Sequence, residues 1–224
     1  MHTILCFGDS NTNGCNPKCD IRDWKMPGEQ PPVRYNRDMR WTGILQKLLG
    51  DEYYVIEEGL PGRTFMYEDA ILPDRAGKDM IRPCMWTHNP VDLLVVMLGT
   101  NDTKSLYGSR EYILATGIEE FLKIAKDPAI WDPGIKPNIL LVAPPPLGDN
   151  IQTSPYYGMF DEKSVELSKK FSELYKAIAN VNKCHYFDAG LYAESDPGDS
   201  IHFSPQGHRK LAEGLAKKIR EICE

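Results

Sequence analysis

The chain has 224 residues, of which 42% are hydrophobic and 26% charged, and a formal net charge of −6 at pH 7. This length and composition fit one globular domain, which we expect to span residues 1–224. Acidic and basic residues are interspersed without a basic stripe, which argues against nucleic acid or an anionic membrane as a partner. The apolar run at the N-terminus is too short for a signal-peptide core or a membrane span, so we expect a cytoplasmic protein.

The six cysteines are scattered along the chain, and their spacings do not repeat as those of a zinc site would. We therefore expect free thiols and no metal. Cys15 and Cys19 are close enough in sequence to form a disulfide, but this would require export to an oxidising compartment.

Short apolar runs alternate with segments of helical spacing. The predicted strands are Ile4–Phe7, Tyr53–Ile56, Leu93–Leu98, Ile139–Ala143 and His185–Phe187. The predicted helices are Trp41–Leu49, Tyr112–Ala125, Glu162–Ala179 and Pro205–Ile222. Ser204 and Pro205 form a side-chain cap and a first-turn proline for the last helix. The alternation predicts an α/β fold with a parallel sheet.

Three long irregular segments interrupt this pattern, at residues 11–40, 60–90 and 144–161. Loops of this length in compact domains usually have a function. In an open parallel sheet the ligand lies beyond the carboxyl ends of the strands. We therefore expect the functional residues in the loops that follow the first four strands.

Ser10 is the first candidate, because Gly8-Asp9-Ser10 directly follows the first predicted strand. Gly8 allows a tight turn that would present Ser10 as a nucleophile at the end of this strand. An Asp-Ser pair is also typical of a helix N-cap. The tripeptide alone leaves both interpretations open.

Asp199 and His202 lie three residues apart in the loop before the last predicted helix. At this spacing the carboxylate can reach the imidazole Nδ1–H, which leaves Nε2 free to accept a proton from a serine hydroxyl. A polar loop with a solvated histidine is the alternative interpretation.

Two further strand ends offer donors for a negatively charged oxygen. Asn101 follows the most hydrophobic strand, where its side-chain N–H could stabilise a tetrahedral intermediate. An Asx turn would also explain this asparagine. Gly59 ends another strand and could expose its backbone N–H as a second donor. One edge of the sheet would then bring together the nucleophile, the base, the acid that orients the base, and the two oxyanion donors.

In this order, Gly8-Asp9-Ser10, Gly59, Gly99-Thr100-Asn101-Asp102 and Asp199-x-x-His202 resemble the four signature blocks of the SGNH hydrolases, also called the GDSL esterase/lipase family. The resemblance runs from the first strand to the last helix and implies a three-layer, flavodoxin-like α/β/α fold with a central parallel sheet. It implies a catalytic triad of Ser10, His202 and Asp199. It also implies an oxyanion hole formed by Ser10 N–H, Gly59 N–H and the Asn101 side chain, with no cofactor.

Four segments are most similar to the arylesterase/acyltransferase branch of this family: Arg40–Gly43, Val55–Leu60, Met97–Lys104 and Pro144–Leu147. That branch acts on small acyl esters, can transfer the acyl group to alcohols or peroxide, and forms homo-oligomers, which the resemblance implies here. The chain departs from it at Asn11, where the family motif has Leu, and at Asn13 and Cys15, where the branch often has tryptophans. These changes predict a more polar acyl pocket. The candidate substrate-binding residues are Asn11, Asn13, Tyr156, Tyr157 and Phe160.

The leading prediction is a serine esterase that hydrolyses short-chain aryl or alkyl esters through an acyl-enzyme on Ser10. A carbohydrate O-deacetylase is the alternative, because the same triad serves acetylated sugars and a polar entrance would suit them. A catalytically silent binding module is a third interpretation, which the intact signature blocks disfavour. The other histidines lack an aspartate three residues upstream, so we expect no catalytic role for His2, His88, His185 and His208.

Overall fold

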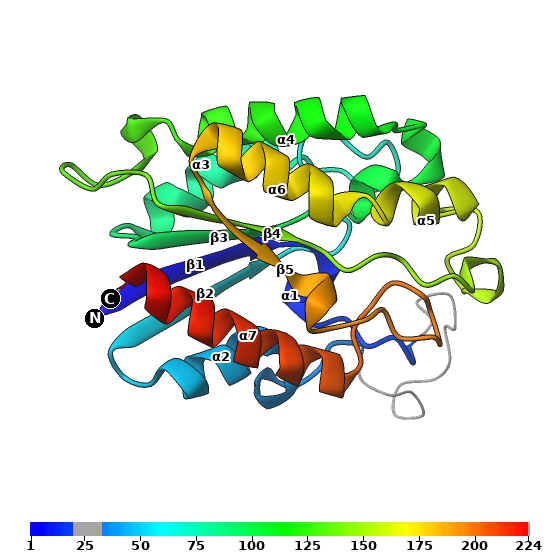
Figure 1. Cartoon of the computed structure of the whole chain (residues 1–224), viewed down its shortest axis with the longest axis horizontal. Coiled ribbons are helices and arrows are strands. Elements are labelled where there is room, and N and C mark those ends of the chain that lie inside the picture. The colour runs from blue at the N-terminus through cyan, green and yellow to red at the C-terminus, as the bar shows by residue number, and fades with distance from the viewer. Residues whose placement is uncertain (20–32, 224) are drawn as a thin grey trace.

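The computed structural model describes residues 1–19 and 33–223. In this part of the chain, a parallel five-stranded sheet has the strand order β2-β1-β3-β4-β5. The strands are β1 (His2–Gly8), β2 (Tyr53–Gly59), β3 (Leu93–Met97), β4 (Ile139–Ala143) and β5 (His185–Asp188). Figure 1 shows the sheet between two layers of helices, so the predicted three-layer α/β/α fold is confirmed.

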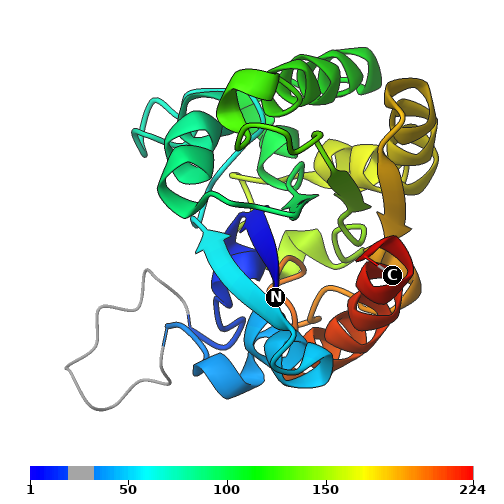
Figure 2. The same cartoon turned by 90° about the vertical axis from the view of Figure 1, so that its left-hand side faces the viewer.

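Helices cover both faces of the sheet. One layer contains α2 (Trp41–Leu49) and α7 (Pro205–Cys223), and the other contains α3 (Gly77–His88), α4 (Glu111–Ala125) and α6 (Phe171–Asn182) (Figure 1). The short helices α1 (Ser10–Asn13) and α5 (Glu162–Ser168) lie toward the carboxyl ends of the strands (Figure 1). Figure 2 views the opposite end of the sheet, where both termini lie. This arrangement leaves the carboxyl edge to the loops that carry the candidate residues.

Burial on both faces explains why the central strands are apolar along their whole length. In β1, Leu5 and Phe7 pack into the core beneath α3, α4 and α6, whereas Ile4 and Cys6 pack into the core with α2 and α7. Every residue of β3 and β4 is buried. These apolar runs made the strands predictable within two residues of their observed ends, except that β2 continues to Gly59, three residues beyond the predicted end at Ile56.

The helices differ from prediction in two places. α3 lies within the segment 60–90, which we expected to be irregular; its Gly77 and its internal Pro83 obscure the helical pattern in the sequence. The predicted helix Glu162–Ala179 is divided into α5 and α6, because the Lys170 N–H donates to Leu167 O, three residues back, rather than four. The expected cap of α7 is present, with Gly207 N–H donating to Ser204 Oγ at 3.2 Å.

Two other expectations concern the environment of the protein. Across residues 1–19 and 33–223, no helix combines the length and the apolar character needed to cross a membrane. Cys6, Cys15, Cys84 and Cys184 are free thiols, as predicted. Part of the expected irregular segment 11–40, residues 20–32, lies outside the described residues.

Candidate active site

Ser10 is the first residue of α1 and is separated from β1 by Asp9 alone. Asp9 Oδ1 accepts the Asn11 N–H at 2.9 Å, so Asp9 is the N-cap of this short helix. Gly8 packs so closely on α1 that a Cβ at this position would lie 2.0 Å from Thr12 Oγ1. The cap interpretation therefore applies to Asp9, and Ser10 lines a pocket.

Asp199 and His202 form a buried pair, with 2.5 Å between Asp199 Oδ2 and His202 Nδ1. The other carboxylate oxygen, Oδ1, accepts the backbone N–H groups of Ile201 and His202, each at 2.9 Å. Ser200 has a φ of 63°, in the left-handed region, where the loop curls back around the carboxylate. Three hydrogen bonds thus fix the Asp199 carboxylate. Because Asp199 Oδ2 can only accept a hydrogen bond, the ring proton of neutral His202 lies on Nδ1.

Ser10 and His202 line the same pocket of about 260 Å³, together with Asn101. Most of the remaining wall is apolar and includes Cys15, Leu72, Tyr156, Met159, Phe160 and Ile201. The Tyr156 ring meets the His202 ring edge-on, at a centroid distance of 5.6 Å. The fold therefore brings a serine from the start of the chain and a histidine from its end to one largely apolar cavity.

Gly59 does not line this pocket. A Cβ at Gly59 would lie 2.2 Å from the backbone nitrogen of Asn13, so this glycine allows α1 to pack against β2. Its carbonyl oxygen accepts a hydrogen bond from Asn13 Nδ2 at 3.2 Å. We infer a packing role for Gly59 rather than the donor role expected from the sequence.

Gly62, three residues further on, lines the pocket instead. Arg63 N–H donates to Leu60 O at 3.0 Å, and Gly62 has a φ of 85°, which together describe a type II turn with Pro61 and Gly62 at its centre. Asn101 Nδ2 donates to Arg63 O at 3.1 Å and so lies against this turn. Pro61-Gly62 is a dipeptide typical of a turn and is the sequence signal that identifies this one.

Tyr156 and Phe160 line the pocket, whereas Tyr157 is 51% exposed and does not. Asn11 and Asn13 do not line it either. Their side chains bond within the protein, Asn11 to the loop that carries His202 and Asn13 to β2. The expectation of a polar pocket built from these two amides is therefore wrong, because both are used to anchor α1.

Two buried carboxylates lie behind the candidate residues. Burial raises the pKa of Asp9 to about 6, against the lowering effects of the Asn11 N–H and of His202. Burial also raises the pKa of Asp102 to about 7, although its carboxylate accepts the Phe65 N–H. Neither carboxylate lines the pocket, which fits a supporting role.

His208, on α7, is fully buried. Burial, with a smaller contribution from the charge of His202, lowers its pKa to about 3. Its Nδ1 accepts the Trp41 N–H at 3.3 Å. It is therefore a neutral core histidine that links α7 to α2.

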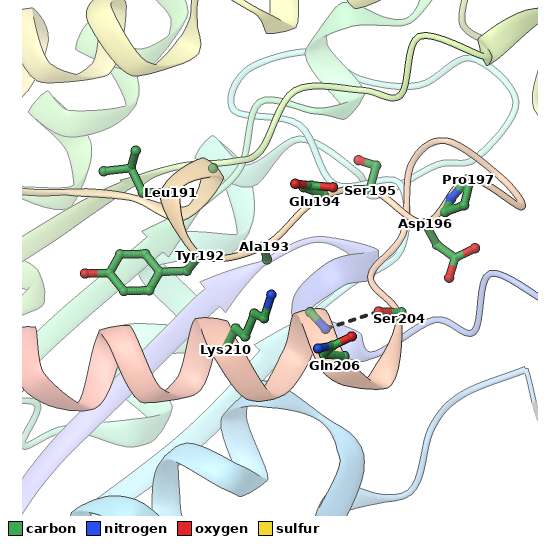
Figure 3. A pocket seen from close by; sticks show the side chains of 12 residues that line it. Leu191, Tyr192, Ala193, Glu194, Ser195, Asp196, Pro197, Ser204, Gln206 and Lys210 are labelled. Carbon is green, nitrogen blue, oxygen red and sulfur yellow. Dashed lines mark hydrogen bonds between the residues drawn. The ribbon is translucent and has the colours of Figure 1, made fainter.

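A second pocket, of about 250 Å³, lies between residues 190–197 and the start of α7. Figure 3 shows Glu194 and Ser195 on its loop side and Gln206 and Lys210 on its helix side. Neither Ser10 nor His202 lines it.

Within the described ranges, no group of three or more His, Cys, Asp or Glu side chains is arranged to hold a metal ion.

Comparison with known proteins adds to this geometry. The model of the GDSL-like lipase/acylhydrolase family matches residues 6–210. A carbohydrate acetylesterase from Sinorhizobium meliloti is 35% identical, with a TM-score of 0.87 and coverage of 99% of this chain and 100% of that chain. The native aryl esterase of M. smegmatis is 33% identical, with a TM-score of 0.87 and the same coverage of 99% and 100%. No curated protein matched the chain.

Proposed function

The chain belongs to the GDSL-like lipase/acylhydrolase family and is a carboxylic ester hydrolase, and we propose that Ser10, His202 and Asp199 are its catalytic triad. This proposal rests on one observation: Ser10 and His202 line the same pocket, and Asp199 is hydrogen-bonded to Nδ1 of the His202 ring. The comparisons concern the reaction class, whereas the triad assignment rests on this geometry.

In the proposed reaction, Ser10 Oγ attacks the ester carbonyl while His202 Nε2 takes the hydroxyl proton. Asp199 holds the Nδ1–H and stabilises the imidazolium that forms. The tetrahedral intermediate collapses, the alcohol leaves with the proton from His202, and an acyl group remains on Ser10. Water then attacks the acyl-enzyme with His202 again acting as base, which releases the acid.

The oxyanion would be stabilised by three donors, namely the Ser10 N–H, the Gly62 N–H and Asn101 Nδ2. Gly62 and Asn101 border the pocket beside Ser10, which supports this set over one that includes Gly59. Such donors act strongly because they are fixed in a site with little water before charge develops.

We propose short-chain aryl or alkyl esters as substrates, because the pocket is small and mainly apolar. The same apolar wall favours acyl transfer to an alcohol as a side reaction, since transfer in water requires exclusion of water from the acyl-enzyme. Carbohydrate O-deacetylation is the second candidate, supported by the similarity to the Sinorhizobium meliloti carbohydrate acetylesterase. The ratio of kcat/KM for phenyl acetate and an acetylated sugar separates the two.

We further propose that the protein acts as a cytoplasmic homo-oligomer. The free thiols Cys6, Cys15, Cys84 and Cys184 are typical of a reducing compartment. Ile71 is 79% exposed and directly precedes Leu72, a 39% exposed residue of the pocket wall, and these two exposed apolar side chains support a contact between subunits beside the pocket. Light scattering of the purified protein and cell fractionation test the two parts of this proposal.

The triad assignment is tested with Ser10→Ala and a fluorophosphonate probe. We expect the probe to label Ser10 in the native protein, and the variant to lose both labelling and turnover of phenyl acetate while it keeps the native circular dichroism spectrum. Undiminished turnover by the variant would exclude Ser10 as the nucleophile. Absence of labelling and of turnover in the native protein would favour a silent binding module.

A further inference from the structure

Arg75 lines the same pocket as Ser10, Asn101 and His202. Its backbone is held beside the Gly62 turn, because Thr64 N–H donates to Arg75 O at 3.0 Å. A Cβ placed on Gly62 would lie 3.4 Å from both Cδ and Nε of Arg75. The Nε atom of Arg75 therefore lies beside the Gly62 turn, which we assign to the oxyanion hole.

The edge of the Arg75 guanidinium formed by Nε and Nη2 has no hydrogen-bond acceptor among the described residues. Arg75 Nη1 donates to Pro73 O at 2.6 Å. Arg75 Nε is buried from solvent and has no hydrogen-bond partner among the residues that the structure describes. In the same part of the chain, no carboxylate forms an ion pair with Arg75. A buried donor without an acceptor is unfavourable, and a ligand that supplies an acceptor removes this cost.

The neighbouring cations Lys104 and Arg63 are less available to a substrate than Arg75. Lys104 also lines the pocket, but its Nζ donates to the buried carboxylate of Asp69 at 2.7 Å. Arg63 Nε is likewise buried without a hydrogen-bond partner among the described residues, but Arg63 does not line the pocket; its Nη1 donates to the carbonyl oxygens of Gly8 and Glu58, and its guanidinium carbon lies 4.0 Å from the centre of the Phe7 ring. Among the described cations that line the pocket, Arg75 and Lys104, Arg75 is therefore the one with an edge available to a substrate.

We propose that Arg75 binds a carboxylate of the substrate, so that the preferred substrates are short esters with one carboxylate near the scissile bond. This proposal rests on the esterase function proposed above. The Nε and Nη2 donors share one edge of the guanidinium, and a carboxylate can accept both of their hydrogen bonds in parallel. Because Lys104 is neutralised by Asp69, Arg75 is the described pocket cation without a carboxylate partner, and one such cation matches a singly charged group better than a doubly charged phosphate.

Two matched pairs of esters test the proposal. Monoethyl succinate and ethyl butyrate place a carboxylate or a methyl group at the end of the acyl chain. In the alcohol half, 3-acetoxybenzoate and phenyl acetate differ by one carboxylate. We expect native kcat/KM to favour the charged ester of at least one pair by about ten-fold or more at low ionic strength, with the preference reduced by salt.

The ratio of charged to neutral kcat/KM should fall to about one or below in Arg75→Met. Arg75→Lys should retain part of the ratio, because lysine keeps the charge and loses the paired donors. Arg82→Met is the matched control, since Arg82 pairs with Asp127 away from the pocket, and it should keep the native ratio. Circular dichroism and thermal unfolding of each variant verify the fold.

Three results would overturn the role of Arg75: equal kcat/KM for the esters of both pairs in the native protein, a preference that survives in Arg75→Met, or an equal loss on charged and neutral esters. The last result would indicate a general electrostatic effect on the oxyanion. Failure of the esterase proposal looks different, because the native protein would then cleave none of the four esters or Ser10→Ala would cleave them equally well.

Discussion

The side chain of Asn11 bonds to the backbone on both sides of His202. Its Nδ2 donates to Ile201 O at 3.1 Å, and its Oδ1 accepts the Phe203 N–H at 3.1 Å. Asn11 follows Ser10 directly and is 4% exposed. One buried amide therefore ties the segment of the candidate nucleophile to the loop of the candidate base, which lie at opposite ends of the chain.

Asn11→Leu, which restores the residue usual in the family motif, should lower both stability and turnover. Leucine cannot bond to Ile201 O or the Phe203 N–H. Ile201 O keeps the weaker hydrogen bond from Ser195 Oγ at 3.4 Å, whereas the Phe203 N–H loses its acceptor, and a buried group left unpaired costs about 1–3 kcal/mol. We expect a lower free energy of unfolding in urea and about a ten-fold fall in kcat, with KM changed less, because a small displacement of His202 affects proton transfer more than binding.

Asn13→Ala is the matched control for this change. Its amide donates to Gly59 O and accepts from Cys15 Sγ, and in the described part of the chain it forms no hydrogen bond to the His202 loop. We expect kcat close to the native value. If Asn11→Leu kept the native kcat while it lost stability, the amide would be a structural link only.

Asp199→Asn should reduce kcat by roughly 10³–10⁴ with little change in the fold. The asparagine can still accept the two backbone N–H groups through Oδ1, whereas its amide nitrogen cannot accept the Nδ1–H of His202. The imidazole then loses its preferred tautomer and its stabilising charge. Steady-state kinetics on phenyl acetate and a crystal structure of the variant would check this prediction.

His202→Ala and the double variant with Asp199→Asn test whether the pair acts as a unit. We expect the double variant to be about as slow as His202→Ala alone, since an orienting acid has no effect without its base. Additive losses would indicate that Asp199 contributes independently of His202.

Asn101→Ala should reduce kcat by about 10²–10³ if its amide stabilises the oxyanion. The side chain lies on the pocket wall and donates to Arg63 O in the absence of substrate. A boronic acid that mimics the tetrahedral intermediate should lose affinity by a similar factor, whereas the KM for phenyl acetate should change less. Equal losses in KM and kcat/KM would instead assign Asn101 to ground-state binding.

Features set by local sequence were predictable, and features set by long-range contacts were not. The apolar runs of β3 and β4 predict buried strands directly. Asn11 was recognised as unusual, but its partners Ile201 and Phe203 lie about 190 residues away, so the sequence suggested a substrate contact instead of an internal link. This distinction depends on tertiary packing.

Our proposal of Gly62 in place of the predicted Gly59 as oxyanion donor has a related cause. The sequence pointed to the loop after β2 and to Gly59, the glycine at the strand end. The type II turn carries the chain on to Gly62 before it reaches the pocket. The position of a glycine relative to a strand end does not reveal whether it faces a ligand or a packed helix, because only the neighbouring segment α1 decides this.

Stability should depend on pH through His208. Its pKa is about 3 in the folded protein, compared with an ordinary value of 6.5. Between these two values the unfolded chain binds a proton at this position that the folded chain does not, so the free energy of unfolding decreases as the pH falls. The contribution of one such group is at most about 1.4 kcal/mol per pH unit.

His208→Asn tests this dependence, because the asparagine oxygen can accept the Trp41 N–H and does not titrate. We expect the native protein to lose more stability than the variant between pH 7 and pH 4, as measured by urea unfolding at several pH values. The carboxylates titrate in both proteins, so their effects cancel in the comparison. If the difference in stability between the two proteins stayed constant with pH, His208 would be protonated equally in the folded and unfolded states, and burial would not be lowering its pKa.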